Sequence, residues 1–370
     1  MNKVLLLYNT ASYLYRFRRG LIDKLRQKGY KVITVASPDK YAKNIEEISD
    51  LFIPVEFNRD FRKPVSDVKL LFTLLKIYRK YKPDFALHYT IKANIYGTIS
   101  AKINHIKVIN TITGLGYIFL DNSVFSRFLR FVYRLVLKLS DYVIFQNKED
   151  VNIIGTRWLR RFKIVPGSGV DLNHYSPHYC QNNSSSNGGF TFLFIGRLLK
   201  TKGFLELVKA AEKIHSKYQN INFWVVGEID EGNPSFIDRQ LLEHYIKTGV
   251  IKYFGFQDDV REFICKADVV VLPSYREGLS RVLLEAASMG KPLLATNVPG
   301  CREIVLPQFN GILVEPRNVE ALVEGIETFL KLSRAKLQEM GKNSRYLVEK
   351  YFDEKIVVGE YLSVLNSLRR

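Results

Sequence analysis

Two glutamates stand close together in the sequence where an expected strand gives way to a helix. Glu277 and Glu285, with seven residues between them, follow the apolar run at residues 269–272, which is typical of a buried strand. Glu277 falls in the loop at the carboxyl end of that strand, where open α/β sheets bind ligands, and could accept hydrogen bonds from hydroxyl groups. The first helix amides, near Leu279 and Ser280, lack intrahelical partners and suit a phosphate.

A ligand with hydroxyl groups at both ends and phosphate in between would satisfy this set of groups. A nucleotide diphosphate sugar is such a ligand. The simpler alternative is that Glu277, which precedes Gly278, caps the helix while Glu285 lies on the surface, because acidic residues favour helix starts. Spacing alone leaves both interpretations open.

A second strand, loop and helix upstream favours the phosphate interpretation. Residues 190–195 are typical of a buried strand, which Gly196 ends, and an amphipathic helix follows. Arg197 and Lys202 bracket the loop, so two cations and a helix start converge there. Arginine can donate two parallel hydrogen bonds to a diphosphate, while lysine supplies a compact charge. A solvated basic loop is the alternative, but the glutamates downstream in the same expected sheet favour a diphosphate.

These segments resemble a known family. GRLLKTKG, WVVGE and the run from YFGFQDDV to PGCREIV resemble the carboxy-terminal half of the family 4 retaining glycosyltransferases, over about residues 190–315. The resemblance implies the GT-B fold, an α/β architecture of two Rossmann-like domains facing a central cleft, with a C-terminal helix that crosses back to the first domain. It implies that Arg197 and Lys202 hold the donor diphosphate. Glu277 would then contact the hydroxyls of the donor sugar, and Glu285 the ribose.

The donor site implied by the resemblance also includes the base. Residues 254–258 would lie beside it, with Gly255 letting the backbone approach the ligand closely. Glu277, Arg197 and Lys202 are expected to take part in catalysis, without a cofactor and without a metal. The donor-binding residues expected in total are Gly196, Arg197, Lys202, Phe254, Gly255, Phe256, Glu277, Gly278, Leu279, Ser280 and Glu285.

The amino-terminal half is similar to the family more weakly, through HYTIKANIYGTISAK, NTITGLGYIF and VPGSGVDLNHYSP. These segments resemble the subgroup that builds capsule, O-antigen and lipid-linked N-glycan precursors. Two common features of the family are missing. No histidine follows the expected strand in VINTITGLG, and the first loop, residues 9–13, lacks paired glycines. We therefore assign neither role to this chain.

Several polar residues of the first half could bind an acceptor. Arg16, Arg18 and Arg19 stand at an expected helix start, where cations oppose the helix dipole unless an anion is held nearby. We expect them to help bind the pyrophosphate of a polyprenyl-linked acceptor; exposed arginines are the alternative. The glycine-rich loop at residues 113–117 could approach a substrate or be a plain tight turn. The acceptor-binding residues expected in total are Arg16, Arg18, Arg19, Lys92, Asn94, Thr113, Gly114, Leu115 and Gly116.

His88 ends another expected strand of this half and is the best remaining candidate for a catalytic role, although a lone histidine is more often structural. The other histidines form no pattern with ligand spacing. Three cysteines, Cys180, Cys265 and Cys301, are odd in number and lack metal spacing. We therefore expect no metal site and no disulfide framework, which suits a reducing cytoplasm.

A chain of 370 residues suits two domains. Strand and helix patterns alternate from the start, which predicts parallel sheets. The amino-terminal apolar run is too short for a signal peptide, and no uncharged apolar stretch is long enough to span a bilayer. The expected divisions are residues 1–170 for an acceptor-binding, membrane-facing domain, 171–189 for a linker, 190–351 for a nucleotide-sugar-binding domain and 352–370 for the C-terminal helix.

Nearly all of the net charge of +18 lies in the first half. Residues 1–170 contain 30 Lys and Arg against 13 Asp and Glu, whereas residues 171–370 contain 25 against 24. This asymmetry predicts an anionic partner for the first domain.

The strongest candidate for that contact is an expected amphipathic helix in the segment VFSRFLRFVYRLVLKL. One interpretation lays this helix on anionic lipid. The other packs its apolar face on the sheet and leaves its cations in water. Its apolar face comprises Phe125, Phe128, Leu129, Val132, Leu135, Val136 and Leu139, and its cations are Arg127, Arg130, Arg134 and Lys138.

These observations predict a hexosyltransferase that moves a hexose or N-acetylhexosamine from a UDP-sugar to a polyprenyl-diphosphate-linked saccharide, at the inner face of the cell membrane. Two other classes stay open. A nucleotide-sugar epimerase of the same fold would need no acceptor. A nucleic-acid-binding protein is suggested by the pI near 9.6, but no RNP-like, KH-like or finger pattern occurs, so we expect no nucleic acid partner.

Overall fold

The computed structural model describes residues 2–58, 64–115, 119, 123–181 and 189–369. The chain forms two compact units. Unit 1 comprises Met1–Ser168 and Glu354–Arg370, and unit 2 comprises Gly169–Asp353.

Unit 1 is built on a sheet of seven parallel strands in the order β3-β2-β1-β4-β5-β6-β7. The central strands are mostly apolar, since helices cover both faces of the sheet. The strands are β1 (Lys3–Thr10), β2 (Lys31–Ser37), β3 (Leu51–Pro54), β4 (Phe85–Tyr89), β5 (Lys107–Ile112), β6 (Tyr142–Phe145) and β7 (Phe162–Ile164).

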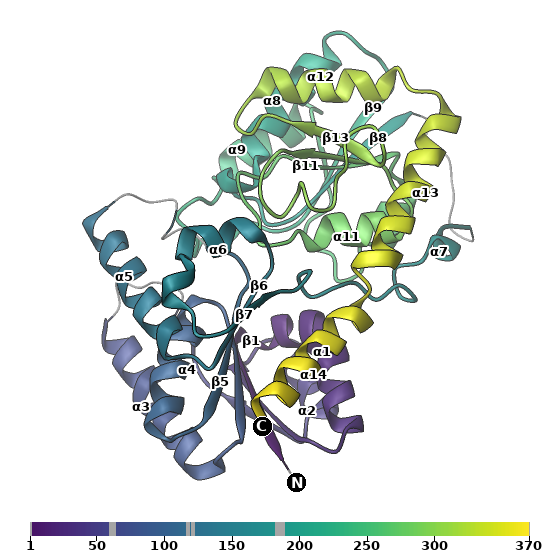
Figure 1. The fold of residues 1–370 in the computed structure, drawn as a ribbon. Helices are drawn as coiled ribbons and strands as arrows, with labels where there is room; N and C mark the ends of the chain where they lie inside the picture. Colours follow the sequence, from purple (N-terminus) through teal and green to yellow (C-terminus); the bar gives the residue numbers. More distant parts are fainter. Residues whose placement is uncertain (1, 59–63, 116–118, 120–122, 182–188, 370) are drawn as a thin grey trace. The chain divides into compact units, whose positions relative to one another are not determined.

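Helices α3, α4 and α5 cover one face of this sheet, and α1, α2 and α14 lie on the other (Figure 1). The C-terminal helix α14 thus belongs to unit 1, where the Tyr361 hydroxyl lies 2.9 Å from that of Thr111. The helices of unit 1 are α1 (Ala11–Gln27), α2 (Ala42–Ile48), α3 (Pro64–Tyr81), α4 (Ile91–Ile103), α5 (Val124–Leu139), α6 (Lys148–Ile154), the 3-10 helix η2 (Thr156–Trp158) and α14 (Glu354–Arg369).

The first helix begins earlier than the sequence predicts. Thr10 is its N-cap, and the Thr10 side chain accepts a hydrogen bond from the Tyr13 amide. Residues 9–13 therefore form no loop, because strand β1 runs directly into α1. The expectation that Arg16, Arg18 and Arg19 stand at a helix start is wrong, since they lie well inside α1, where the dipole argument does not apply.

Unit 2 is built on six parallel strands in the order β10-β9-β8-β11-β12-β13. The strands are β8 (Phe190–Ile195), β9 (Ile221–Val226), β10 (Lys252–Tyr253), β11 (Val269–Leu272), β12 (Leu293–Thr296) and β13 (Gly311–Val314). Helices α8 and α12 pack together, as do α11 and α13 (Figure 1). The helices are α7 (Pro177–Gln181), the 3-10 helix η3 (Lys200–Lys202), α8 (Phe204–His215), α9 (Arg239–Lys247), α10 (Arg261–Lys266), α11 (Arg281–Ser288), α12 (Val319–Leu330) and α13 (Arg334–Tyr351).

The expected linker, residues 171–189, differs from the structure over its described part. Residues 171–181 belong to unit 2, where α7 packs against α10. A disulfide joins Cys180 to Cys265, whose Cα atoms lie 5.1 Å apart, and Cys301 is free and buried. The expectation of no disulfide is wrong in this structure. The two cysteines are 85 residues apart, so only the fold brings them together.

In each sheet the strand order reverses once, between β1 and β4 in unit 1 and between β8 and β11 in unit 2. Ligands of open α/β sheets bind beside such reversals, outside the carboxyl ends of the strands. The predicted α/β class with two Rossmann-like sheets is confirmed. None of the described helices is apolar over a length sufficient to cross a membrane.

Candidate functional site

The loops that follow β8 and β11 meet at the reversal point of unit 2. Lys202 Nζ donates a hydrogen bond of 2.5 Å to Glu277 Oε1, and Ser274 Oγ donates one of 2.6 Å to the same oxygen. The side chains of Lys202 and Glu277 are 22% and 13% exposed. The structure therefore brings together two of the predicted residues, 75 positions apart, in a site that solvent still reaches.

A glycine allows these two loops to touch. Gly203 ends the loop that carries Lys202 and has a φ of +74°. A Cβ atom there would fall 2.0 Å from the carbonyl oxygen of Pro273, at the start of the loop that carries Glu277. Only glycine fits, so close backbone packing fixes the spacing between lysine and glutamate.

A third loop, which follows β12, packs against the backbone of Glu277. The Glu277 amide donates to the Pro299 carbonyl over 3.0 Å. Gly300 has a φ of +80°, and a Cβ atom there would lie 2.5 Å from Glu277 Cβ and 2.7 Å from its carbonyl carbon. The sequence analysis missed the role of Gly300, although a glycine after a proline in a strand-end loop was a usable signal.

Arg197 also has an acidic partner. Its Nη1 donates to Asp230 Oδ2 over 2.7 Å, and Asp230 lies in the loop after β9. That loop approaches closely, because a Cβ on Gly227 would fall 1.8 Å from the Gly196 carbonyl oxygen. Both predicted cations of the site therefore face carboxylates that an anionic ligand would have to displace or share. Asp230 was also missed, since nothing in the sequence pairs it with Arg197.

Glu285 is only 9% exposed, so the alternative that it is a surface residue is wrong. Its Oε1 accepts a hydrogen bond of 2.9 Å from Arg281 Nε. Burial raises the pKa of the Tyr175 hydroxyl, and the neighbouring Glu285 carboxylate, to which it is hydrogen-bonded, raises it further. The Glu285 carboxylate is thus hydrogen-bonded to the Arg281 guanidinium and to the neutral Tyr175 hydroxyl.

The start of helix α11 departs from the prediction. Ser280 is the N-cap, and its Oγ accepts from the Leu283 amide, so Glu277 does not cap the helix. The Ser280 amide donates to the Gly300 carbonyl over 2.9 Å, so the expectation of a free amide there is wrong. The reason is that Ser280 has extended backbone geometry and precedes the helical turn whose amides point along the axis.

The residues expected beside the base of the donor differ in how exposed they are. Phe254 is partly buried and packs edge-on against Trp224 and Phe263 at the margin of the unit 2 core, with ring centroids 5.2 and 4.9 Å apart. Gly255 has a φ of +67°, and a Cβ atom there would meet nothing within 4 Å among the described residues. Phe256 is 39% exposed. Gly255 and Phe256 therefore lie where a ligand could approach.

In unit 1, His88 is fully buried. Its Nε2 lies 2.7 Å from the Tyr78 hydroxyl and its Nδ1 lies 2.9 Å from Asn110 Oδ1. Burial lowers the pKa of His88 to about 3. The ring is therefore neutral at physiological pH and both nitrogens have partners, which favours the structural interpretation over the catalytic one.

Two of the expected acceptor-binding cations are also buried. The Arg18 guanidinium lies 4.2 Å above the Tyr89 ring and 5.4 Å from the Tyr361 ring centroid. Lys92 Nζ donates to Asp67 Oδ1 over 2.6 Å. The Arg18 contact with Tyr361 joins α1 to α14, and the Lys92 bond to Asp67 joins α4 to α3. Both contacts point to structural roles for Arg18 and Lys92.

The other two arginines of α1 lie nearer to solvent. Arg16 Nη2 donates to the Tyr41 hydroxyl over 2.8 Å. Arg19 has a 60% exposed side chain with its Nε 3.8 Å from an Asp23 carboxylate oxygen. Arg19 is the more exposed of the two and has the exposure that the predicted contact with an anion needs.

The reversal point of unit 1 contains a strained residue that the sequence did not indicate. Thr90, the N-cap of α4, has φ +71° and ψ 157°, a region that branched residues avoid. Several buried oxygens here have no hydrogen-bond partner within the described part of the chain, among them Asn9 Oδ1, Thr90 Oγ1 and Asn94 Oδ1. Strain and unsatisfied polar atoms concentrate at functional sites, so the carboxyl ends of β1 and β4 form a second candidate site.

The glycine-rich loop after β5 is described only in part. Thr113 is hydrogen-bonded to Tyr8, and burial raises the pKa of the Tyr8 hydroxyl. Gly114 has a φ of +120° and Leu115 is fully buried. Gly116 lies outside the described residues.

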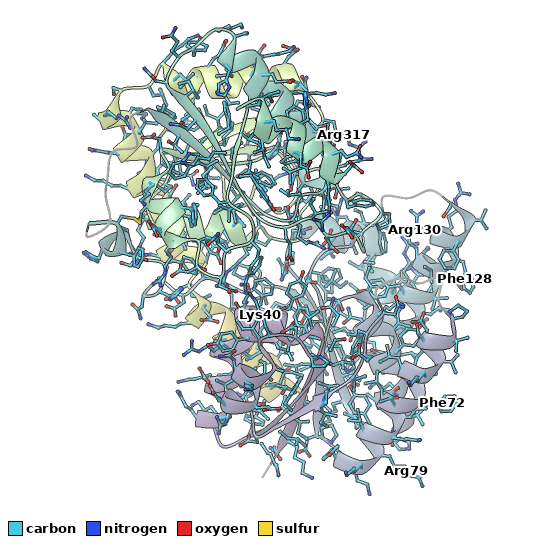
Figure 2. All side chains as sticks on the ribbon, turned by 180° about the vertical axis from the view of Figure 1, so that it is seen from behind. Lys40, Phe72, Arg79, Phe128, Arg130 and Arg317 are labelled. Atoms are coloured by element: carbon cyan, nitrogen blue, oxygen red, sulfur yellow. A yellow bond between two sulfur atoms is a disulfide. The ribbon has the colours of Figure 1, made fainter. Side chains whose placement is uncertain are left out.

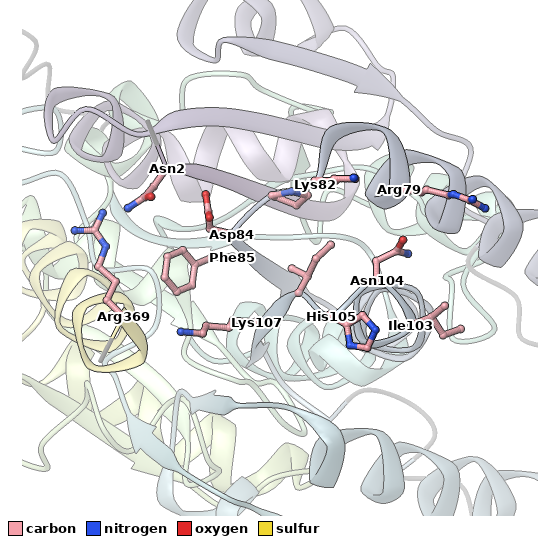
Figure 3. Close-up of a pocket in the computed structure, with 12 residues that line it drawn as sticks. Asn2, Arg79, Lys82, Asp84, Phe85, Ile103, Asn104, His105, Lys107 and Arg369 are labelled. Carbon is pink, nitrogen blue, oxygen red and sulfur yellow. The ribbon is translucent and has the colours of Figure 1, made fainter.

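A pocket of about 810 Å³ lies at the opposite, amino-terminal edge of the unit 1 sheet (Figure 3). Helices α3, α4 and α14 end around it, and Lys107 Nζ donates to the Leu368 carbonyl there. Such cations neutralise the carbonyl ends of helices. The pocket is therefore separate from both candidate sites. Among the residues that the structure describes, no group of three or more His, Cys, Asp or Glu could hold a metal ion.

Comparisons with known proteins bear on both units. Residues 179–346 match the family described as Glycosyl transferases group 1, and residues 3–147 match the family described as Glycosyl transferase 4-like. The chain is a glycosyltransferase of the family 4 type. The two matches cover the carboxyl-end loops of both sheets, where the candidate sites lie.

Three relatives of this glycosyltransferase are named for the reaction or pathway in which they act. It is 27% identical over 373 residues to the N,N'-diacetylbacillosaminyl-diphospho-undecaprenol alpha-1,3-N-acetylgalactosaminyltransferase of Campylobacter jejuni, covering 97% of this chain and 96% of that protein. It is 28% identical over 374 residues to the capsular polysaccharide biosynthesis glycosyltransferase CapM of Staphylococcus aureus, covering 97% and 95%. The UDP-Gal:alpha-D-GlcNAc-diphosphoundecaprenol alpha-1,3-galactosyltransferase of Escherichia coli is 26% identical over 277 residues, covering 71% and 70%.

Solved structures share the fold of this glycosyltransferase. Sucrose-phosphate synthase from Thermosynechococcus elongatus has a TM-score of 0.84 at 19% identity, covering 100% of this chain and 99% of that one. Anabaena HepE in complex with UDP has a TM-score of 0.78 at 18% identity, covering 99% and 100%. The predicted GT-B fold is confirmed.

Proposed function

We propose that the protein transfers a hexose or N-acetylhexosamine from a UDP-sugar to a polyprenyl-diphosphate-linked saccharide, with retention of the anomeric configuration and without a metal ion. The reaction would serve surface polysaccharide or glycan assembly at the inner face of the cell membrane. Relatives from Campylobacter and Escherichia are named for diphosphoundecaprenol-linked substrates, which supports this acceptor class. They are named as transferases, which favours transfer over the epimerase reaction.

The observation that carries the proposal is the contact of Lys202 with Glu277 at the β8/β11 reversal, where the loop that carries Lys202 also carries Arg197. During transfer, the bond between the anomeric carbon and the diphosphate breaks, and that carbon bonds to an acceptor hydroxyl oxygen, whose proton passes to the diphosphate. Negative charge develops on the departing diphosphate. Two cations held at fixed positions stabilise that charge without reorganising. Glu277 would accept hydrogen bonds from the sugar hydroxyls.

Other residues of unit 2 would supply the remaining contacts with the donor. Glu285 would bind the ribose hydroxyls, with Arg281 and Tyr175 holding its carboxylate in place. Gly255 and Phe256 would lie beside the base. Arg197 is paired with the Asp230 carboxylate in the structure. When the donor binds, Arg197 would leave Asp230 and bind the diphosphate.

The acceptor would bind at the β1/β4 reversal of unit 1. The unsatisfied oxygens of Asn9 and Thr90 could pair with hydroxyl groups of a saccharide, while Asn94, which is fully buried and donates to Thr111 and Tyr133, would support them. His88, Arg18 and Lys92 would support this region from the interior.

A cytoplasmic location has a consequence for the disulfide. Cellular thiols would keep Cys180 and Cys265 reduced there. Helix α7 would then stay on α10 through other contacts, such as Arg261 stacked 4.3 Å from the Tyr179 ring centroid. We therefore give the disulfide no part in the reaction.

The test is a panel of nucleotide sugars, scored by UDP release with and without polyprenyl-diphosphate-linked saccharides. We expect release only when donor and acceptor are both present, and its loss in Glu277→Ala with the fold retained by circular dichroism. A new sugar formed from the donor alone would support the epimerase and contradict transfer.

A further inference from the structure

Helix α5 turns its apolar side outward. Tyr133, Val136 and Leu137 are its buried apolar residues, and they face the sheet. Val136 is the one residue of the predicted apolar face among them, so that face as a whole does not pack on the sheet. The exposed apolar residues are Phe125 at 46%, Phe128 at 61%, Phe131 at 50%, Leu135 at 41% and Leu139 at 46%.

Helix α3 shows a second outward apolar row. Val65, Val68 and Phe72 are 83%, 53% and 59% exposed and recur at spacings of three and four, so they lie on one side of the helix. The opposite side, including Leu70 and Leu74, packs against the sheet. Exposed phenylalanine and valine in two organised rows are unusual for a surface with no partner.

The two rows lie on the same face of unit 1. Helix α4 packs against both α3 and α5, and all three cover one side of the sheet. Figure 2 shows Phe72 and Phe128 projecting from the same side of the unit. We call the apolar rows of α3 and α5 together the outer apolar surface.

Within helices α3 and α5, exposed cations accompany this surface and no exposed acidic residue does. Asp67 is the one acidic residue in the sequences of α3 and α5, and it is buried and paired with Lys92. Arg79 continues the α3 row seven positions after Phe72 and, with Lys82, lines the basic pocket of Figure 3. The exposed cations of the two helices are Lys69, Lys76, Arg79, Lys80, Arg127 and Lys138.

The whole net charge of the chain belongs to this unit. Unit 1 contains 33 Lys and Arg against 15 Asp and Glu, and unit 2 contains 22 of each. A second copy of the chain would bring the same cations against these, which disfavours self-association through this surface. An extended anionic partner with an apolar layer beneath its charges satisfies both features.

We propose that the outer apolar surface docks on an anionic lipid bilayer. Phe72, Phe128 and their neighbours enter the boundary between headgroups and acyl chains, and the flanking lysines and arginines meet lipid phosphates. This inference extends the proposed function, which supplies a lipid-linked acceptor, by assigning the face that meets the membrane and by adding α3 to it.

The test is sedimentation of the full-length protein with vesicles of phosphatidylcholine alone or with about one-third phosphatidylglycerol. We expect at least about tenfold stronger partitioning to the anionic vesicles, weakening with salt. F72S/F128S should lower that partitioning by about tenfold or more, because two large side chains leave the interface. The matched control, I246S/F309S, removes two residues of unit 2 with 39% and 36% exposure and should partition as the wild type does.

Three results would overturn the proposal. These are equal partitioning to neutral and anionic vesicles, equal partitioning of F72S/F128S and the wild type, or light scattering in which a wild-type dimer becomes a monomer in F72S/F128S. The last would assign the surface to a second copy of the chain.

Activity assays separate this proposal from the proposed function. F72S/F128S should keep the wild-type kcat/KM on a lipid-free acceptor and lose turnover on a vesicle-embedded one. If the wild type used no acceptor of any kind, the proposed function would fail, while the vesicle measurements would still decide the docking surface.

Discussion

Replacing Gly300 with alanine should disable the donor site through the backbone of Glu277. Gly300 has a left-handed φ of +80°, and its added Cβ would fall 2.5 Å from Glu277 Cβ. The neighbouring carbonyl carbon and oxygen of Glu277, each at 2.7 Å, are main-chain atoms, so no rotamer change relieves the contact. The loop that carries Glu277 must therefore move.

The size of the effect follows from two terms. A Cβ in the left-handed region costs about 1–2 kcal/mol. The contact must also open from 2.5 Å to about 3.4 Å, which shifts Glu277 by about 1 Å. A misplacement of about 1 Å at a catalytic group costs about 100-fold, so kcat/KM should fall by that order.

Gly249→Ala is the matched control. Gly249 has a φ of +72°, and a Cβ atom there would meet nothing within 4 Å among the described residues. It should show the stability cost of the left-handed alanine by urea unfolding, with kcat/KM within about twofold of the wild type. If Gly300→Ala lost no more activity than Gly249→Ala, the argument that loop packing positions Glu277 would be refuted.

Three further predictions concern other parts of the chain. Asp230→Asn removes the carboxylate that competes for Arg197, so the donor KM should fall by about two- to fivefold; a higher KM in initial-rate assays would contradict the exchange. His88 has its pKa lowered to about 3 from an unfolded value near 6.5, so the folded state excludes a proton and stability is lost as the pH falls below about 6.5. Between pH 6.5 and pH 5 that loss is roughly 2 kcal/mol in urea unfolding, and His88→Gln should not show it; parallel pH profiles would argue against a buried neutral imidazole. Dithiothreitol should lower the stability of unit 2 by about 4 kcal/mol by opening the Cys180–Cys265 loop and leave kcat unchanged; a large loss of kcat would give the disulfide a role at the site.

Much of the fold could be predicted because it depends on local patterns. The strands at residues 190–195 and 269–272 were placed at their observed bounds, since buried parallel strands are short apolar runs ended by glycine or proline. The start of α1 could not be placed, because the strand passes into the helix without a loop. The disulfide escaped prediction since its cysteines are distant in sequence.

The contact of Lys202 with Glu277 was easier to predict than the surroundings of the candidate residues in unit 1. Lys202 and Glu277 stand in loops that any parallel sheet brings to one edge, so residue type and strand position sufficed. In unit 1, His88 and Lys92 lie near the carboxyl end of β4 and Arg18 lies inside α1, and all three side chains turn inward to Tyr, Asn and Asp partners. Only the packed structure shows that direction, and the strain at Thr90 leaves no mark on the residue type.

A crystal of the protein grown with UDP would test the central claim most directly. The account predicts the diphosphate between Arg197 and Lys202, with the ribose hydroxyls on Glu285. Nucleotide bound away from these three side chains, or none bound where Lys202 meets Glu277, would contradict it.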